Sequence, residues 1–457
     1  MRSVAMQCAE SGLRVAAVTP SVAMHGLLAV DRSGEPLTRL LTWGDQRSAS
    51  QSAALHADGR AAALYKRTGT PIYPMSPLVK LLWFREEASD TKKRAAKWIS
   101  IKELLFLRLL NRVAVDYSVG AAMGLINIRT LKWDDEALAL VGLEPTQLAE
   151  LVAPYDVVGH VDADRARFLG LPPGTPFYAG SSDGLLATVG SGALSEGVAS
   201  CSVGTSGAVR VATREPALDP DGTLFCYPLR GDVWVVGGPV NNGGIALEWL
   251  RDRVLSDASR RRSSEELSYQ EVDELAADAA PGADGLVFVP YLLGERAPQW
   301  EPRARGAFAG LTLQHGREHM SRAVMEGVAL QLGLVLRKVE QLVGRVRELR
   351  ATGGFASSPV WRQVMADVFG REVLFPREQQ SVCLGAAILG MAAMGWLDSL
   401  SAVNDMVAIE RSHKPEPATR ALYDELRTRY EIVVGALSSL SWPRPDPAED
   451  AWSDGSV

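Results

Sequence analysis

The sequence contains few cysteines, and those it has are scattered. Four occur among 457 residues, Cys8, Cys201, Cys226 and Cys383, and no two share the short spacing of a zinc site or a redox pair. This pattern argues against a disulfide framework or a structural zinc cluster as the basis of the fold. A reduced, cytoplasmic setting is the simplest interpretation.

Neither an excess of charge nor a long apolar run is present. The 48 Lys and Arg residues are nearly balanced by 54 Asp and Glu residues, a net charge of −6, so we expect neither a nucleic-acid nor a membrane partner. The short basic clusters at 92–94 and 260–262 are expected on solvated faces or loops. No segment is long and apolar enough to cross a bilayer, and the first twenty residues lack the apolar core of a signal peptide. These absences predict a soluble protein.

The chain does have enough apolar material for sizeable cores, since 47% of its residues are hydrophobic and 22% are charged. A length of 457 residues predicts two or three domains. In the first half, the apolar pattern predicts strands at 13–18 and 27–30 and helices at 77–87 and 101–110. Strands mixed with helices in two halves predict an α/β protein of two domains, with a boundary near 185–195.

The second half begins with a predicted β-hairpin. Two β-rich arms at 198–213 are joined by a Gly-Thr-Ser-Gly turn, and a further arm at 232–238 leads through a Gly/Asn-rich turn into a helix. An apolar stripe at three- and four-residue spacing predicts a long helix from Met320 to Leu342. The Pro-rich, acidic tail at 442–457 is expected to be disordered.

Asp183 stands where a predicted strand, residues 174–180, ends in a Ser/Gly-rich turn and a helix begins. One interpretation is that Ser182 or Asp183 caps the helix, because short polar side chains satisfy the free N–H groups of a first turn. The other is that Asp183 is a functional acid, since it falls at the predicted junction of two domains, where clefts commonly form. This segment alone does not decide between them.

A glycine pair, Gly353 and Gly354, follows another predicted strand. The pair forms a turn free of side chains, Ser357 or Ser358 can cap the helix that follows, and Pro359 suits its first position. A strand, a Gly-Gly turn and a helix N-terminus let a nucleotide approach the backbone closely. A plain β–α connection has the same pattern and remains the alternative.

A second glycine turn lies between the arms of the predicted hairpin. Gly204 and Gly207 flank Thr205 and Ser206, so backbone N–H groups and two hydroxyls can converge on an anion. An ordinary hairpin turn would have the same sequence features. Neither glycine turn has the spacing of a Walker motif, so a nucleotide would be held by another arrangement.

Seven segments, taken together and in order, resemble the FGGY family of carbohydrate kinases. They include "MHGLLAVDRSGEPL", "GSSDGLLATVGSGAL", "SVGTSG" and "ATGGFASSPVWRQVMADVFGREV", and they lie at 24–48, 180–194, 202–207, 290–312, 322–332, 351–373 and 384–390. The resemblance implies an α/β, actin/hexokinase-like (ribonuclease H-like) fold with a substrate-binding domain at 1–190 and a nucleotide-binding domain at 191–441. It also implies phosphorylation of a sugar or polyol by ATP, with Mg²⁺ bridging the phosphate oxygens.

Within the family, three segments are most similar to gluconokinases, which phosphorylate D-gluconate to 6-phosphogluconate. They lie at 68–87, 100–118 and 131–143. A kinase for another sugar, such as xylulose, remains an alternative, because substrates shift among related sugar kinases. The resemblance implies a small-molecule sugar or sugar acid as partner, and it leaves the oligomeric state open, with a homodimer among the alternatives.

The resemblance also assigns roles to individual residues. It implies that Asp183 is the catalytic base and reaches Mg²⁺ through water, and that Met24 and His25 line the sugar site. The residues implied for the nucleotide are Gly204 and Thr205 at the phosphates, Gly244 in a glycine-rich turn, and Gly353, Gly354 and Ser358 near the adenosine. A positioned carboxylate fits phosphoryl transfer, in which the protein mainly orients groups and neutralises charge.

A sugar acid adds a requirement that neutral sugars lack, because its carboxylate needs cations or N–H donors. Four basic residues in the matching segments are predicted to supply them: Lys80, Lys102, Arg47 and Arg296. For each of these residues, the alternative role is a surface charge or a structural ion pair. The type of residue alone does not separate these roles.

The chain departs from the family at its start. Family members begin with a strand and a tight D-x-G-T-like loop that binds phosphate, whereas Met1 falls inside what resembles the first helix. We expect the first domain to be incomplete at this end, with apolar surface exposed and one acid missing from the metal site. Two explanations stand: the natural chain is longer and active, or the product is a truncated, catalytically inactive sugar-binding homologue.

Overall fold

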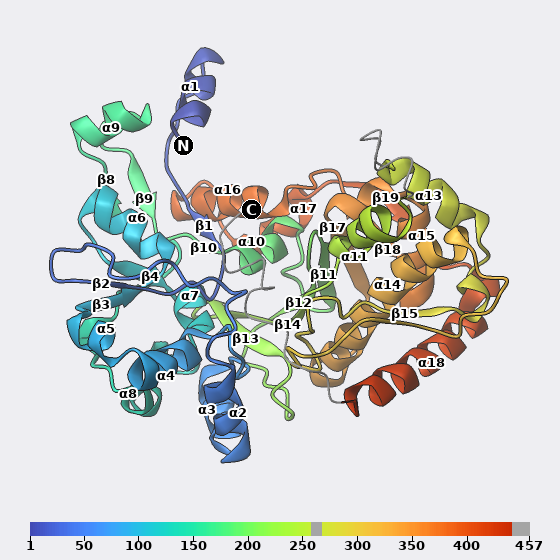
Figure 1. The fold of residues 1–457 in the computed structure, drawn as a ribbon. Coiled ribbons are helices and arrows are strands. Elements are labelled where there is room, and N and C mark those ends of the chain that lie inside the picture. The colour runs from blue at the N-terminus through green and yellow to red at the C-terminus, as the bar shows by residue number, and fades with distance from the viewer. Residues whose placement is uncertain (257–266, 441–457) are drawn as a thin grey trace.

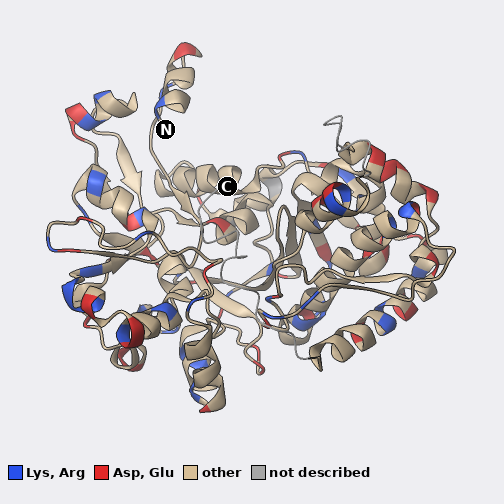
Figure 2. Ribbon diagram, in the orientation of Figure 1, with Lys and Arg blue, Asp and Glu red and all other residues tan. Residues whose placement is uncertain are grey.

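The chain folds into two lobes that lie side by side. The computed structural model describes residues 1–256 and 267–440, and Figure 1 shows the N-terminal lobe in blue to green and the larger lobe in green to red. The predicted disordered tail at 442–457 and the basic cluster at 260–262 lie outside the described residues. Lys and Arg alternate with Asp and Glu over both lobes in Figure 2. Among the described helices, each is too short or too polar to span a bilayer.

A seven-stranded sheet organises the larger lobe. In order across the sheet the strands are β13 (Phe225–Arg230), β14 (Val233–Val240), β12 (Gly207–Thr213), β11 (Val198–Val203), β17 (Glu348–Thr352), β18 (Val373–Pro376) and β19 (Ile409–His413). The first four pair antiparallel, β11, β17 and β18 run parallel, and β19 returns antiparallel. The hairpin predicted at 198–213 is confirmed as β11 and β12.

Helices cover the faces of this sheet. They are α11 (Gly244–Trp249) with its continuation η2 (Leu250–Val254), α13 (Tyr269–Asp278), α14 (Arg317–Val343), α15 (Pro359–Phe369), α16 (Ser381–Ala393), α17 (Val403–Met406) and α18 (Arg420–Ser438). Shorter elements are β15 (Val287–Val289), β16 (Ala307–Ala309), η3 (Ala283–Gly285), η4 (Gly354–Ser357), η5 (Leu400–Ala402) and η6 (Pro417–Thr419). Helix α14 packs its apolar stripe against β12 and β14, which confirms the long helix predicted at 320–342.

The N-terminal lobe is built from short strand pairs and helices. The pairs are β1 (Ser21–Val22) with β10 (Ser181–Ser182), β2 (Leu28–Val30) with β3 (Lys97–Ile99), β4 (Ala114–Asp116) with β7 (Glu150–Val152), β5 (Ile126–Asn127) with β6 (Lys132–Trp133), and β8 (Val157–His160) with β9 (Pro176–Tyr178). The helices are α1 (Arg2–Glu10), α2 (Ala49–Ala57), α3 (Arg60–Thr68), α4 (Pro77–Glu87), α5 (Ser89–Arg94), α6 (Ile101–Leu110), α7 (Tyr117–Ala122), α8 (Asp135–Val141), η1 (Pro145–Gln147) and α9 (Ala163–Leu169). The helices predicted at 77–87 and 101–110 are confirmed as α4 and α6.

The strand predicted at 13–18 is wrong, whereas the strand predicted at 27–30 is confirmed as β2. Within 13–18 only Val18 makes a bridge, to Phe177. Residues 14–17, Thr19 and Ser21 line an open groove whose other wall includes α16, with Met391 among its apolar side chains. A strand is held by its neighbours in a sheet, so the apolar composition of this segment did not determine its pairing.

The two lobes meet where α10 (Asp183–Gly190) crosses α16, near the centre of Figure 1. The backbones approach so closely that a Cβ on Gly190 would lie 1.8 Å from the carbonyl oxygen of Ser381. A Cβ on Gly385 would lie 2.0 Å from the carbonyl oxygen of Leu186. Only glycine allows helices to cross at this distance, so these glycines fix the junction.

A second contact joins the lobes at α3 and β13. The N–H of Cys226 donates to the carbonyl of Gly69 at 2.8 Å, and the Tyr65 hydroxyl donates to the carbonyl of Leu224 at 2.7 Å. Nearby, the indole N–H of Trp234 donates to a carbonyl of the N-terminal lobe at 3.1 Å. The lobes are therefore tied by buried hydrogen bonds as well as by packed helices.

Candidate active site

Asp183 lies at the point where β10 ends and α10 begins, at the junction of the lobes. Its Oδ1 accepts the N–H of Gly184 at 2.7 Å, and its side chain is only partly buried. Neither Ser182 nor Asp183 makes the side-chain hydrogen bond of a helix cap. The capping interpretation therefore loses its support, and Asp183 keeps an oxygen that a ligand can reach.

The pKa of Asp183 is raised above its usual value, mainly because burial disfavours the charged carboxylate. The Arg210 guanidinium, the N–H of Gly184 and the Arg296 guanidinium act in the opposite direction and lower it. A carboxylate that is partly desolvated but still held by positive charge is a stronger proton acceptor than an exposed one. This environment suits a general base.

Lys102 supports the segment before Asp183 from behind. Its Nζ forms a fully buried ion pair with Asp116, and the Asp116 carboxylate accepts the N–H of Ser118 at 2.9 Å. The Ser118 hydroxyl in turn lies 2.8 Å from the Ser181 hydroxyl. The charge of Lys102 is thus neutralised by Asp116 inside the lobe, and its predicted contact with the substrate stays a prediction.

His25 has a left-handed backbone, with φ of 65°, and its side chain is buried. Its Nδ1 donates to the carbonyl of Ala122 at 2.8 Å, which leaves Nε2 as an acceptor on a neutral ring. Burial, and secondarily the Lys80 charge, lower the pKa of His25 to about 3. A neutral imidazole with a free acceptor can bind a sugar hydroxyl. The Met24 methyl lies against Gly184, beside Asp183.

Lys80 lies beneath the His25 turn. Its fully buried Nζ donates to the carbonyl of His25 at 2.9 Å, to that of Thr42 at 2.7 Å and to that of Leu41 at 3.5 Å. Burial lowers the pKa of Lys80 to about 7. These bonds to backbone carbonyls hold the His25 turn, and the predicted contact of Lys80 with the substrate stays a prediction.

The two predicted arginines differ in their surroundings. Arg47 is half-exposed, and its Nε lies 2.9 Å from Asp45 in a surface ion pair. Arg296 is buried, and its guanidinium lies 5.1 Å from the centre of the Trp43 ring. Of the four basic candidates, the structure brings only Arg296 into electrostatic contact with Asp183.

Sequence reasoning missed Arg210, which lies in the middle of β12 and is buried. A signal for it was available, since a lone arginine interrupts the apolar strand "GAVRVAT". Buried arginines are rare unless a partner neutralises them, so such a residue in a predicted strand indicates a functional or structural charge.

The glycine turn at 204–207 and the turn that starts α11 are hydrogen-bonded to each other. The N–H of Gly244 donates to the carbonyl of Gly204 at 2.6 Å, and the N–H groups of Gly243 and Ile245 donate to the carbonyl of Thr205 at 3.0 and 3.2 Å. A Cβ added to Gly204 would meet no atom within 4 Å. The structure thus brings together three residues predicted to bind the nucleotide, Gly204, Thr205 and Gly244, beside open space.

Gly353 and Gly354 lie next to the same turn. Gly353 has φ of 118°, and a Cβ there would lie 2.1 Å from the carbonyl oxygen of Val203, at the end of β11. A Cβ on Gly354 would meet nothing within 4 Å. The Ser358 hydroxyl accepts the N–H of Trp361 as the cap of α15, so its predicted contact with a nucleotide stays a prediction. The open face at Gly204 and Gly354 fits a phosphate-bearing ligand.

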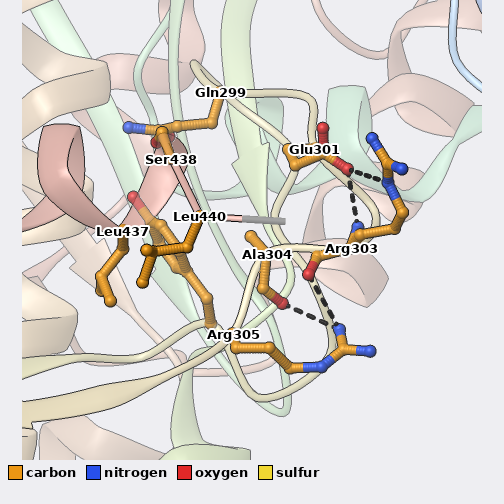
Figure 3. A pocket seen from close by; sticks show the side chains of 9 residues that line it. Gln299, Glu301, Arg303, Ala304, Arg305, Leu437, Ser438 and Leu440 are labelled. Atoms are coloured by element: carbon orange, nitrogen blue, oxygen red, sulfur yellow. Dashed lines mark hydrogen bonds and ion pairs between the residues drawn. The ribbon is translucent and has the colours of Figure 1, made fainter. Parts of the chain in front are cut away.

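The cavity in Figure 3 lies apart from this constellation. It is lined by Tyr291, Gln299, Glu301, Arg303, Ala304 and Arg305, and by Leu437, Ser438 and Leu440 at and just after the end of α18. Its charged groups already have partners, since Arg303 pairs with Glu301 and Arg305 donates to two neighbouring carbonyls. None of the predicted site residues lines it. No cluster of three metal-ligating side chains occurs within 1–256 and 267–440.

Two family models cover most of the chain. The N-terminal domain of the FGGY family of carbohydrate kinases matches residues 1–190, and its C-terminal domain matches residues 199–394. The chain belongs to the FGGY family of carbohydrate kinases. It is therefore a sugar kinase of the α/β, two-domain type, and members of this family use ATP.

Several relatives of this FGGY kinase resemble it over nearly its whole length. Gluconokinase from Bacillus licheniformis is 44% identical over 92% of this chain and 82% of its own. The crystal structure of gluconate kinase from Lactobacillus acidophilus matches with a TM-score of 0.89 at 34% identity, covering 96% of this chain and 87% of that one. The ligand-bound xylulose kinase from Lactobacillus acidophilus matches with a TM-score of 0.90 at 33% identity, covering 96% and 88%.

Proposed function

We propose that this kinase transfers a phosphoryl group from ATP to D-gluconate, giving 6-phosphogluconate. The observation that carries the proposal is the likeness to gluconokinase over nearly the whole chain, joined to a partly buried acid at the lobe junction. The gluconokinase from Bacillus licheniformis is 44% identical to this chain, whereas the gluconate kinase and the xylulose kinase from Lactobacillus acidophilus are 34% and 33% identical. D-gluconate is therefore the preferred substrate of the proposal, and xylulose is the second candidate.

In the proposed reaction Asp183 accepts the proton of the attacking hydroxyl. General base catalysis by a positioned carboxylate contributes about 10²–10⁴ in rate. The free Nε2 of His25 accepts a hydrogen bond from a second sugar hydroxyl and so orients the sugar chain, while Met24 packs beside it. These residues hold the sugar so that one hydroxyl lies next to the base.

The nucleotide is proposed to lie along the glycine turns. Bound ATP supplies the phosphoryl group that is transferred. Backbone N–H groups near Gly204 and Thr205 would receive its phosphates, Gly244 supports that turn, and the open face at Gly354 admits the rest of the nucleotide. The described residues offer Asp183 as a carboxylate here, which fits Mg²⁺, an ion that keeps several waters and uses few protein ligands.

A cytoplasmic location accompanies this proposal. All four cysteines are free thiols, two of them buried, and such residues are usual in a reducing compartment. A kinase that draws on cellular ATP also fits this compartment.

A coupled assay of ADP release over gluconate, xylulose, glycerol and ribulose tests the substrate. We expect kcat/KM for gluconate to exceed the others by at least tenfold. A higher value for xylulose would transfer the proposal to the second candidate. Absence of ADP release with all four, in a folded preparation that still binds gluconate, would support a catalytically inactive sugar-binding protein.

A further inference from the structure

Two buried arginines at the lobe junction leave most of their hydrogen-bonding capacity unused. Arg210 and Arg296 are each 8% exposed, and a guanidinium has five N–H donors. Among the described residues, Arg210 donates from Nη1 to the Ser202 hydroxyl at 3.1 Å, and Arg296 donates from Nη2 to the carbonyl of Val240 at 2.9 Å. The Nε atoms of both are buried without a hydrogen-bond partner.

Two other buried arginines among the described residues, Arg322 and Arg350, each pair with a carboxylate. Arg322, 7% exposed, pairs through Nε with Glu326 and donates to two carbonyls and a tyrosine hydroxyl. Arg350, 8% exposed, pairs with Glu348 at 2.5 Å. By contrast, no carboxylate of the described chain lies within ion-pair distance of Arg210 or Arg296. Burying an unpaired charge is costly, so Arg210 and Arg296 differ from Arg322 and Arg350, whose charges are paired.

Both guanidinium groups lie close enough to the proposed base to lower its pKa. A Cβ on Gly184 would lie 3.2 Å from Nε and Nη2 of Arg210, so this guanidinium rests on the first turn of α10, one residue after Asp183. The positive charge of each arginine lowers the pKa of Asp183. Burial lowers the pKa of Arg210, and the like charge of Arg296 lowers it further. Asp183 thus supplies one negative charge against two positive ones.

The acid next to Arg296 in sequence does not remove this excess. The Glu295 carboxylate accepts the N–H of Asn241 at 2.6 Å and the N–H of Arg296 at 2.7 Å. Burial raises the pKa of Glu295 to about 7. Both of these backbone bonds go to Oε1, and Oε2 lies 3.5 Å from the side-chain amide of Asn242. Glu295 makes no ion pair with either guanidinium group, so the two can take one further anion.

We propose that Arg210 and Arg296 together bind the carboxylate of the substrate and thereby select sugar acids over neutral sugars. This inference rests on the proposed function, because it concerns the same sugar site. Arg296 lies under the Trp43 ring, on the side of the site formed by the N-terminal lobe. Arg210 lies three residues along β12 from Gly207, about 10 Å from the turn proposed for phosphates. The position of the two arginines therefore favours the substrate carboxylate over a nucleotide phosphate as the anion that they bind.

Calorimetric titration without nucleotide tests this proposal separately from catalysis. The ligands are D-gluconate and D-glucitol, which carries a hydroxymethyl group in place of the carboxylate. In the wild type we expect gluconate to bind at least tenfold more tightly than glucitol. In Arg210→Gln and in Arg296→Gln we expect the gluconate Kd to rise about 10- to 100-fold, the usual effect of a lost charged hydrogen bond, with glucitol unchanged.

Arg108→Gln is the matched control, because it removes one positive charge from an exposed pair with Glu35. Its gluconate Kd should stay within twofold of the wild type. If a glutamine variant does not fold, Arg210→Lys and Arg296→Lys keep the charge but lose the planar fork, and they should weaken gluconate alone.

Three results would overturn the inference. Unchanged gluconate affinity in folded arginine variants would remove both residues from carboxylate binding. Equal wild-type affinity for gluconate and glucitol would remove the selection itself. A variant with weaker ATP binding and unchanged gluconate binding would assign the guanidinium groups to phosphate. If the wild type binds no gluconate and phosphorylates another sugar, the result would instead contradict the proposed function.

Discussion

The two lobes position their site residues by different means. In the larger lobe a continuous sheet brings glycine turns together, and backbone contacts at Gly204, Gly244 and Gly353 fix their positions. In the N-terminal lobe, where strand pairs are short, buried lysines do this: Lys80 holds the His25 turn, and the Lys102 ion pair supports the strand before Asp183. Glycines in the larger lobe and buried lysines in the N-terminal lobe thus serve the same purpose: each fixes the backbone of a segment that carries site residues.

Asp183→Asn should have the largest effect, because Asp183 lies at the junction of the two lobes and is the proposed proton acceptor. The amide can still accept the N–H of Gly184 but cannot take a proton from a hydroxyl. We expect kcat for gluconate to fall about 10²- to 10⁴-fold, measured by ADP release, with ATP affinity largely kept. The thermal midpoint is the control and should change little. A kcat within tenfold of the wild type would remove Asp183 as the base.

Gly353→Ala tests the backbone support of the larger lobe. The added Cβ would lie 2.1 Å from the carbonyl oxygen of Val203, at a φ of 118° that non-glycine residues avoid. We expect the free energy of unfolding to fall by about 2–4 kcal/mol in denaturant titration. Gly354→Ala is the matched control, since its Cβ meets no atom within 4 Å, and it should cost less than about 0.5 kcal/mol. Equal losses in the two variants would contradict the close contact.

The buried imidazole of His25 tests the N-terminal lobe through pH. Its pKa is about 3 in the folded protein and 6.5 for an ordinary histidine, so the unfolded chain binds more protons between these values. The free energy of unfolding therefore falls as pH falls through this window, by roughly 2 kcal/mol between pH 7 and pH 5. Urea titration of His25→Gln should show this part of the dependence lost. His160→Gln, a surface variant, should keep it, and an identical slope in all three proteins would contradict the assignment.

Local features of the fold could be predicted from the sequence. Helices α4 and α6 begin and end where the apolar spacing indicates, because Pro77 and the Ser100 cap act on their own first turns. The cap at Ser358 followed in the same way. The segment at 13–18 failed, since its apolar residues describe a strand but the pairing of a strand depends on distant backbone.

Only part of the site could be predicted, because its assembly also depends on contacts between distant parts of the chain. Glycine turns that lie far apart in sequence, at Gly204 and Gly353, come together because β11 and β17 are neighbours in the sheet. The partners of the buried lysines could not be predicted, because sequence gives a charge but not its partner, and those of Lys80 and Lys102 lie inside the lobe. Arg210 was overlooked because only the fold places β12 beside α10.

The hydrogen bonds between α3 and β13 have a consequence for any attempt to divide the protein. A fragment ending near residue 190 would lose Cys226 as the donor to Gly69 and would leave the glycine face of α10 without its crossing helix. The complementary fragment would leave the indole N–H of Trp234 and the N–H of Cys226 without acceptors. We expect neither half to be recovered as a folded piece, although the family boundary falls between them.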